Sequence, residues 1–231
     1  MPELIIDITL QIDTALSVGA GGSGGVLADK AIVRNRLNQL VLPGSHLKGR
    51  LRHACEVIAR AKGLPVCDSP RAENMCPQLS RIKEPPCVIC ALFGSPAWPS
   101  PLQFGDLVYG QPNEVEPGRF LPDKQQPFIR PGASINRRRR TVEEQRLFFT
   151  ETSPPAALVH FHNGQAISGW LPNDERAEAQ VKLLLAGLTL IQNWGGGKSR
   201  GLGWGQVLYQ VRLDDQEVEM AGLRTALGGL K

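Results

Sequence analysis

Two segments far apart in the sequence place cationic and small residues beside flexible backbone. The first is residues 42–52, LPGSHLKGRLR, and the second is residues 195–203, GGGKSRGLG. Glycine lets main-chain N–H groups approach a ligand closely, and a helix N-terminus or a run of exposed N–H groups attracts anions. Because both features occur in one chain, the sequence predicts a phosphate-rich ligand, with RNA or DNA as the first candidate.

Positive charge is clustered locally, although the formal net charge is only +4. Residues 137–140 are all arginine, and Phe148 and Phe149 follow them. Basic patches provide the electrostatic footprint that phosphates need, and aromatic side chains stack on bases. The run therefore fits a nucleic-acid-binding arm, and a solvated charged surface is the alternative.

Cysteines are concentrated in a Pro-rich segment that lacks clear periodicity. Its four cysteines are Cys67, Cys76, Cys87 and Cys90. The last two have the spacing at which two thiolates bind one ion, and four thiolates around Zn²⁺ would order a loop that has little core of its own. We predict a structural zinc site, with His53 as a substitute ligand if one cysteine faces away. Free or partly buried thiols are the alternative.

Two matches to nucleotide-binding motifs lack the context that such motifs need. Residues 19–24, GAGGSG, fit G-x-G-x-x-G, but a dinucleotide site requires a helix directly afterwards, and residues 26–34 have an extended pattern. Residues 196–199, GGKS, resemble part of a P-loop, yet Gln192 stands where that motif has glycine. A helix stop followed by a tight turn is the other interpretation of this glycine segment.

Isolated polar residues provide weaker candidates. Asp29 follows the glycine-rich stretch, and loop aspartates commonly make turns; its candidacy depends on that backbone and on Lys48 further along. His160 and His162 alternate around Phe161, which fits either a solvent-exposed strand face or a cleft. The chain has no Ser-His-Asp signature and no H-E-x-x-H pattern.

The elements that must position these residues follow from hydrophobic periodicity. Alternation predicts strands and helical spacing predicts helices, with Ser45 and Asp174 as candidate N-caps. The expected elements are a strand at 3–13, a helix at 45–62, a strand at 102–109, one or two strands at 157–171 with a turn at Asn163-Gly164, a helix at 174–193 and a strand at 204–213. This order predicts an α+β, ferredoxin-like fold, a scaffold that RNA-recognition domains use.

Composition narrows the class of protein. The chain has 231 residues and is 42% hydrophobic, enough for one domain with insertions or two small domains. No segment approaches the roughly 18 apolar residues of a membrane span, and the N-terminus lacks the features of a signal peptide. We expect a cytoplasmic protein with reduced cysteines and no membrane partner.

Together these motifs resemble the RAMP superfamily of CRISPR-associated proteins, and most of all the repeated backbone subunit of type III effector complexes. Four segments carry the resemblance in the expected order: residues 42–52, residues 87–94 (CVICALFG), the stretch from Arg137 to Phe161 with Glu151 near its end, and residues 195–203.

The resemblance implies a modified RNA-recognition fold as a single domain over residues 1–231, with a zinc-bearing insertion at 64–100 and a thumb-like excursion at 111–153. Copies or paralogues of such a subunit stack along a guide RNA within a larger complex, and the thumb wedges into the guide–target duplex. The implied RNA contacts are Gly44, Ser45, His46, Lys48, Arg50 and Arg52 in the first segment, Arg137 and Arg138 in the thumb, and Gly195, Gly196, Gly197, Lys198, Ser199 and Arg200 in the glycine-rich loop.

A catalytic role for Asp29 also comes from the resemblance. Residues 29–34, DKAIVR, match the family segment whose aspartate supports cleavage of complementary target RNA with Mg²⁺ or Mn²⁺. Two alternatives stay open. The subunit is a catalytically silent scaffold for guide RNA, or it is an endoribonuclease that processes precursor guide RNA with His46 as the catalytic residue.

Overall fold

An antiparallel sheet with helices on one face forms the body of the protein. The computed structural model describes residues 3–19, 21, 28–69, 71–76, 85–110, 127–154, 159–172, 175–214 and 216–217. Within them the main sheet has seven strands in the order β2-β4-β7-β1-β8-β9, and β3 also pairs with β7. The strands are β1 (Glu3–Ile12), β2 (Val41–Leu42), β3 (Leu102–Phe104), β4 (Leu107–Tyr109), β7 (Val159–Trp170), β8 (Gly205–Leu213) and β9 (Gln216–Glu217).

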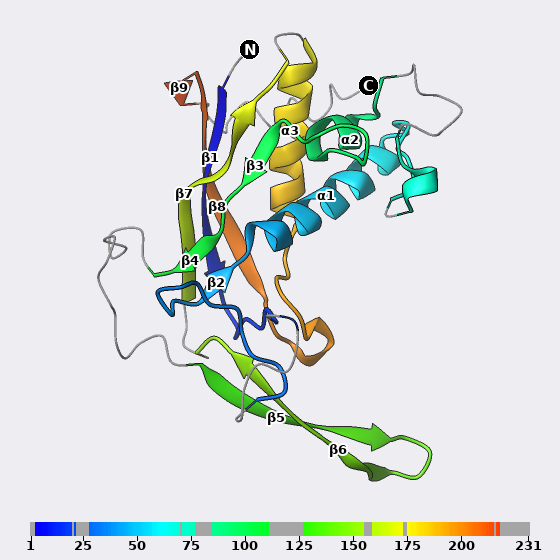
Figure 1. The fold of residues 1–231 in the computed structure, drawn as a ribbon, viewed down its shortest axis with the longest axis vertical. Helices are drawn as coiled ribbons and strands as arrows, with labels where there is room; N and C mark the ends of the chain where they lie inside the picture. Colours follow the sequence, from blue (N-terminus) through cyan, green and yellow to red (C-terminus); the bar gives the residue numbers. More distant parts are fainter. Residues whose placement is uncertain are drawn as a thin grey trace.

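The central strand β1 confirms the alternation seen in the sequence. Its apolar residues Leu4, Ile6, Ile8, Leu10 and Ile12 are fully buried, and the residues between them are not. The strand runs antiparallel to both β7 and β8. Figure 1 shows the helices gathered on one side of this sheet, so the buried face of β1 forms the core beneath them.

Three helices cover that face: α1 (Gly44–Ala61), α2 (Val88–Phe93) and α3 (Glu175–Leu190). The sequence placed the cap of the first helix at Ser45, but the helix begins one residue earlier and Pro43 occupies the N-cap position without a side-chain cap. The Gly44 N–H instead donates to Asp106 Oδ1 at 2.8 Å, so a long-range bond replaces the local cap. The other predicted cap, Asp174, lies outside the described residues.

Two strand predictions need correction. The strand expected at 102–109 is divided into β3 and β4, which residues 105–106 separate. Of the stretch expected at 157–171, residues 159–170 form the single strand β7, and its register against β1 shifts between Ile6 and Ile8. No tight turn forms at Asn163-Gly164; a bulge in a continuous strand takes up the extra residues.

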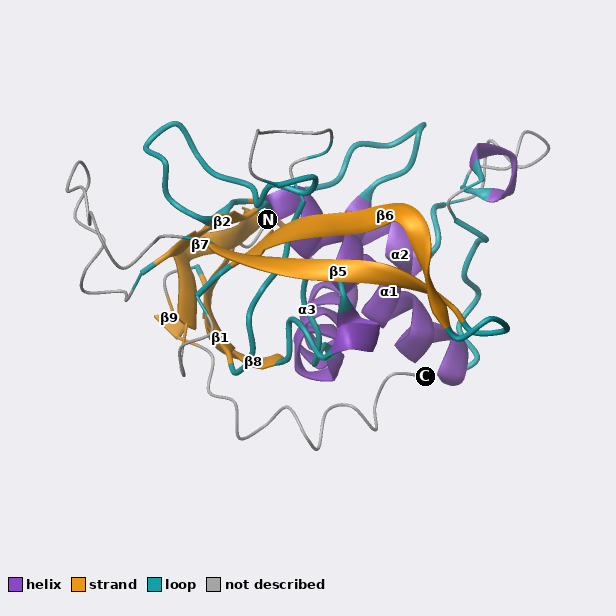
Figure 2. Cartoon of the chain, turned by 90° about the horizontal axis from the view of Figure 1, so that it is seen from below, coloured by secondary structure: helices purple, strands orange, loops and turns teal. Residues whose placement is uncertain are grey.

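A second sheet of two strands, β5 (Phe128–Asn136) and β6 (Thr141–Thr152), projects away from the body (Figure 1). Viewed from below, this hairpin lies across the end of the molecule (Figure 2). Residues 137–140 form the turn at its tip. Of the thumb expected at 111–153, residues 111–126 lie outside the described part of the chain, and the remainder is mainly this hairpin.

Two glycines of α1 differ in the space around them, which gives a matched test of the fold. A Cβ atom at Gly44 would lie 2.1 Å from the Phe104 carbonyl oxygen, whereas one at Gly49 meets nothing within 4 Å. Gly44→Ala should therefore lower the free energy of unfolding by about 3 kcal/mol, while Gly49→Ala should raise it by about 0.5–1 kcal/mol. Denaturant titration measures both, and equal effects would contradict the packing of α1 on β3.

Candidate functional site

The glycine-rich loop lies against the N-terminal half of α1. The Gly195 N–H donates to His46 Nε2 at 3.0 Å, and Arg50 Nη2 donates to the Asn193 carbonyl oxygen at 2.9 Å. The two cationic segments found in the sequence are therefore brought together, although about 150 residues separate them. Side chains from the helix fix the backbone of the loop.

This junction concentrates positive charge. Burial, with the charges of Arg50 and Lys198, lowers the pKa of His46 to about 4. The ring is neutral at pH 7, and because its Nε2 accepts a hydrogen bond, Nδ1 carries the proton. Burial and Arg50 also lower the pKa of Lys198. Neither Arg50 nor Lys198 forms an ion pair with a described acidic side chain, so the junction favours an anionic ligand.

Nitrogen donors at the junction also lack acceptors. Within the described ranges, Arg50 Nε, Asn193 Nδ2 and Trp194 Nε1 are buried without a hydrogen-bond partner. A buried donor without a partner costs about 1–3 kcal/mol, so this part of the molecule has an excess of donors over acceptors. An acceptor-rich ligand such as a phosphate would reduce that imbalance after a small rearrangement.

The loop glycines have structural tasks that the sequence alone did not reveal. Gly195 has φ 69°, and a Cβ atom on it would lie 2.4 Å from the Ser17 carbonyl oxygen. The Gly195 N–H is bound by His46 and the Gly196 N–H donates to Ser17 O at 2.6 Å. These amides are thus engaged within the protein, as is that of Gly44. The side chains of Lys198, Ser199 and Arg200 are exposed, and no bond is described for the Gly197 N–H, so these groups of the loop are available to a ligand.

Asp29 is attached to the base of the hairpin. Its Oδ2 accepts the Phe149 N–H at 2.7 Å, and its own N–H donates to the Phe149 carbonyl oxygen at 3.0 Å. Lys30 bridges to Thr150 in parallel fashion, and the Ile32 N–H donates to Glu151 Oε2. The segment with Asp29 therefore runs beside β6, which holds an exposed carboxylate in a fixed orientation.

Phe148 links this segment to the glycine-rich loop. Its ring centroid lies 5.9 Å from Lys30 Nζ and 5.3 Å from the guanidinium carbon of Arg200. Such distances are typical of cation–π contacts, which are strongest where water is excluded. Asp29, the base of the hairpin, the glycine-rich loop, and His46 and Arg50 of α1 consequently form one continuous region, which we call the junction region.

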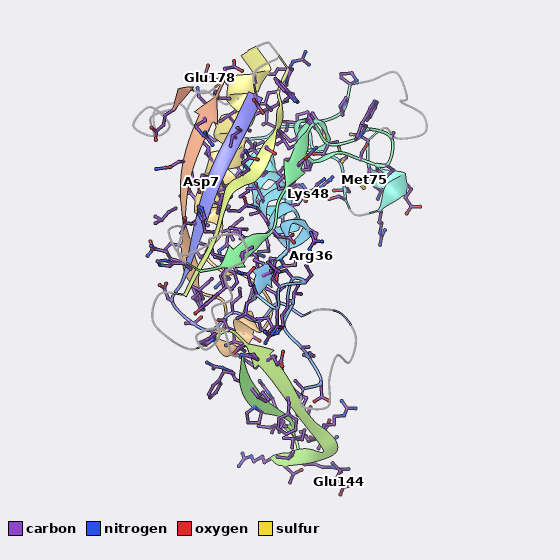
Figure 3. All side chains as sticks on the ribbon, turned by 60° about the vertical axis from the view of Figure 1, so that its left-hand side comes forward. Asp7, Arg36, Lys48, Met75, Glu144 and Glu178 are labelled. Atoms are coloured by element: carbon purple, nitrogen blue, oxygen red, sulfur yellow. The ribbon has the colours of Figure 1, made fainter. Side chains whose placement is uncertain are left out.

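Four other predicted contacts lie away from the junction region. Lys48 Nζ lies over the Phe104 ring at 5.5 Å, and Arg52 reaches the cysteine cluster described below. Arg137 and Arg138 are exposed in the turn at the hairpin tip. Figure 3 shows Glu144, near that tip, far from Lys48 on α1. RNA contacts by these four residues remain predictions.

The four predicted cysteines form a compact cluster. The sulfur atoms of Cys67, Cys76, Cys87 and Cys90 all lie within 4.8 Å of one another. Tetrahedral Zn–S bonds of about 2.3 Å place sulfur atoms about 3.8 Å apart, so the cluster fits such an ion. A hydrogen bond from Cys90 lowers the pKa of Cys87 to about 4, which favours the thiolate that binds metal. His53 is exposed and is not part of this cluster.

The other two histidines occupy β7. His162 Nδ1 lies 3.0 Å from Thr9 Oγ1 and 3.4 Å from Asp7 Oδ1, whereas His160 Nε2 is buried without a described partner. His162 is thus a partly buried member of a hydrogen-bonded pair on the sheet, and neither histidine belongs to the junction region.

Comparison with known families decides the relationship. The sequence profile of the RAMP superfamily matches residues 9–207. The chain belongs to the RAMP superfamily. This membership indicates a CRISPR-associated, RNA-binding protein. Comparison with individual curated proteins gives no match. None of the helices that the structure describes is both long and apolar enough to cross a membrane.

The neutral His46 predicts a pH dependence of stability. Its pKa is about 4 in the folded protein against 6.5 for the free side chain, so the unfolded chain binds the proton first. The stabilisation is complete above pH 6.5 and is lost as the pH falls towards 4, by up to about 1.4 kcal/mol per pH unit. His46→Gln keeps an acceptor for the Gly195 N–H and removes the titration.

Thermal unfolding near pH 7 and near pH 5 tests this expectation. The drop in melting temperature between the two conditions should be smaller in His46→Gln than in the unaltered RAMP protein. The same drop in both proteins would show that His46 does not resist protonation.

The cysteine cluster predicts a metal content. Elemental analysis of the purified protein should find about one zinc per chain, and Cys87→Ser should lower this value because a hydroxyl is a poor ligand for zinc. Cys55→Ala is the matched control, since Cys55 is buried on α1 and its thiol bonds to Leu183 O. A fully folded, metal-free protein would refute the site.

Proposed function

We propose that this RAMP protein is a backbone subunit of a type III CRISPR ribonucleoprotein, which binds guide RNA and cleaves complementary target RNA. One observation carries the proposal. His46 and Arg50 of α1, the glycine-rich loop, Asp29 and the base of the hairpin meet in the junction region. The sheet order β4-β7-β1-β8, with α1 and α3 on one face, supports a ferredoxin-like arrangement.

Guide-RNA binding rests on side chains in this proposal. Arg50 and Lys198 supply charge close to α1, and Arg200 supplies it beside the hairpin. The charged groups of these three side chains would contact successive phosphates, while the Ser199 hydroxyl would donate a hydrogen bond to a phosphate oxygen. Since phosphate contacts carry no base information, the subunit would accept any guide sequence, as a stacked backbone subunit requires.

The hairpin supplies the proposed thumb. Residues paired across the ladder share a face, so Phe148 faces the body and Phe149 faces away. The face with Phe149 is largely apolar, and the exposed fractions of its large hydrophobic side chains lie between 36% for Ile129 and 64% for Ile135. Glu151, which pairs with Ile129, lies on this face at its base, and the apolar residues of the face are Ile129, Pro131, Ala133, Ile135, Val142, Leu147 and Phe149. We assign this face to the guide–target duplex, with Arg137 and Arg138 at the tip beside its phosphates.

Cleavage would use the ribose 2′-OH of a target nucleotide that the thumb displaces. The 2′-oxygen attacks the adjacent phosphorus and the 5′-oxygen leaves, which yields a cyclic phosphate and a 5′-hydroxyl. The protein contributes orientation and stabilises developing charge. Asp29, held by the Phe149 N–H, would orient the 2′-OH and accept its proton. A divalent cation, Mg²⁺ or Mn²⁺, would supply charge stabilisation when bound beside this carboxylate.

Other parts of the proposal follow from the remaining elements. The cysteine cluster in residues 64–100 would hold a structural zinc ion that leaves no open position for catalysis. Neighbouring copies or paralogues of the subunit, together with other subunits of the complex, would share the guide RNA. The cytoplasmic location stays a prediction from the sequence.

Asp29→Asn separates the cleaving subunit from the silent scaffold. The amide oxygen still accepts the Phe149 N–H, so assembly and guide-RNA binding should stay unchanged, while cleavage of target RNA at this subunit's position should fall about 100-fold or more. Asp68→Asn is the control, because Asp68 is an exposed acid paired with Arg60. Undiminished cleavage by Asp29→Asn would assign the chemistry elsewhere.

The environment of His46 argues against the alternative in which this residue catalyses the processing of precursor guide RNA. His46 is neutral near pH 7, and its Nε2 already accepts the Gly195 N–H. A general acid must carry a proton that it can give up near neutral pH, and this ring is committed to holding the loop. His46 therefore acts as a positioning residue in our proposal.

A further inference from the structure

A guanidinium on α1 reaches the cysteine cluster. Arg52 Nη2 lies 3.7 Å from Cys90 Sγ, and Arg52 Nη1 donates to the Gly94 carbonyl oxygen at 2.9 Å. The third nitrogen, Nε, pairs with Glu56 Oε1 at 3.0 Å. One side chain thus contacts a candidate metal ligand and the residue that ends α2.

The pair is shielded from water and held from a second direction. The Arg52 and Glu56 side chains are only 17% and 11% exposed. Ser69 Oγ donates to the same Glu56 oxygen at 2.6 Å, and Ser69 is close in sequence to Cys67. Glu56 therefore orients the guanidinium and ties it to the segment that carries another cysteine.

The negative charge of a metal-bound cysteine cluster explains why a guanidinium contact would be favourable there. Four thiolates around a divalent cation carry a net charge of about −2, and burying such a charge is costly unless donors compensate it. Hydrogen bonds to ligating atoms orient them and raise metal affinity. Arginine is suited to this task because it is always charged and its planar fork serves several acceptors at once.

We propose that Arg52 is a positioning residue of the metal centre. It donates to the Cys90 thiolate, offsets the negative charge of the four sulfur atoms and fastens the cysteine-bearing segments to α1. The proposal rests on the metal site and is independent of RNA binding, although the sequence alone placed Arg52 among the RNA contacts.

Zinc affinity tests the proposal, measured by competition with a chromogenic chelator. Arg52→Gln should weaken zinc binding about 10–100-fold. Arg52→Lys should weaken it less, because lysine keeps the positive charge but lacks the planar guanidinium that serves several acceptors. Arg60→Gln is the matched control. Arg60 Nη2 contacts the Cys67 carbonyl oxygen at 3.3 Å and Asp68, but no sulfur contact is described for it. Its affinity should stay within about twofold of the unaltered protein.

Replacement of zinc by Co²⁺ gives an absorption spectrum that would stay unchanged if Arg52 only supported the fold. Loss of a donor to a thiolate sulfur should shift the sulfur-to-Co²⁺ charge-transfer band in Arg52→Gln and leave it unshifted in Arg60→Gln. Arg52→Lys serves both measurements if Arg52→Gln fails to fold. Unchanged zinc affinity and an unshifted band in Arg52→Lys and in any folded Arg52→Gln would overturn the proposal.

RNA affinity distinguishes this proposal from the function proposed above. Arg52→Gln should leave the salt dependence of guide-RNA binding unchanged once zinc is saturating. A smaller salt slope together with normal zinc affinity would return Arg52 to the RNA contacts. A protein that binds guide RNA but no metal would overturn the role of Arg52 alone.

Discussion

The proposed RNA site depends on the attachment of the glycine-rich loop to α1. His46 and Arg50, one helical turn apart, hold the backbone at Gly195 and Asn193. These bonds keep cations from two distant segments close together despite their mutual repulsion. Burial, together with that repulsion, lowers the pKa values of His46 and Lys198. A polyanion that binds here would offset the repulsion among these cations, so the arrangement favours a polyanionic ligand.

Local patterns predicted the scaffold well. The alternation of β1 and the helical spacing in α1 depend on residues close in sequence, and the structure confirms the strand and the helix, with Leu47, Leu51 and Ala54 buried in the latter. The sequence also indicated that residues 42–52 and 195–203 serve one ligand, and the two segments meet where the Gly195 N–H donates to the His46 side chain. The cysteine cluster followed from composition and spacing, since four thiols in a segment without periodicity have few other ways to order it.

Long-range bonds explain what the sequence did not predict. Several amides expected to hold phosphate already have partners within the protein, because Gly44 donates to Asp106 and Gly196 donates to Ser17. Arg52 was grouped with its basic neighbours, but its guanidinium reaches Cys90, 38 residues away. Likewise, alternation shows that Phe148 and Phe149 face opposite ways, but only the tertiary structure shows that Phe148 faces Lys30 and Arg200. The signal for Arg52 was present in Glu56, its acidic partner four residues later.

The salt dependence of guide-RNA affinity in the assembled complex tests the central claim most directly. The account predicts that log K falls linearly with log salt, and that Arg50→Gln and Lys198→Gln each reduce the slope by about 0.7, the value for one phosphate contact on a single strand. Arg60→Gln, an exposed arginine paired with Asp68, should keep the full slope. An affinity insensitive to salt, or a slope that neither junction variant changes, would contradict the account.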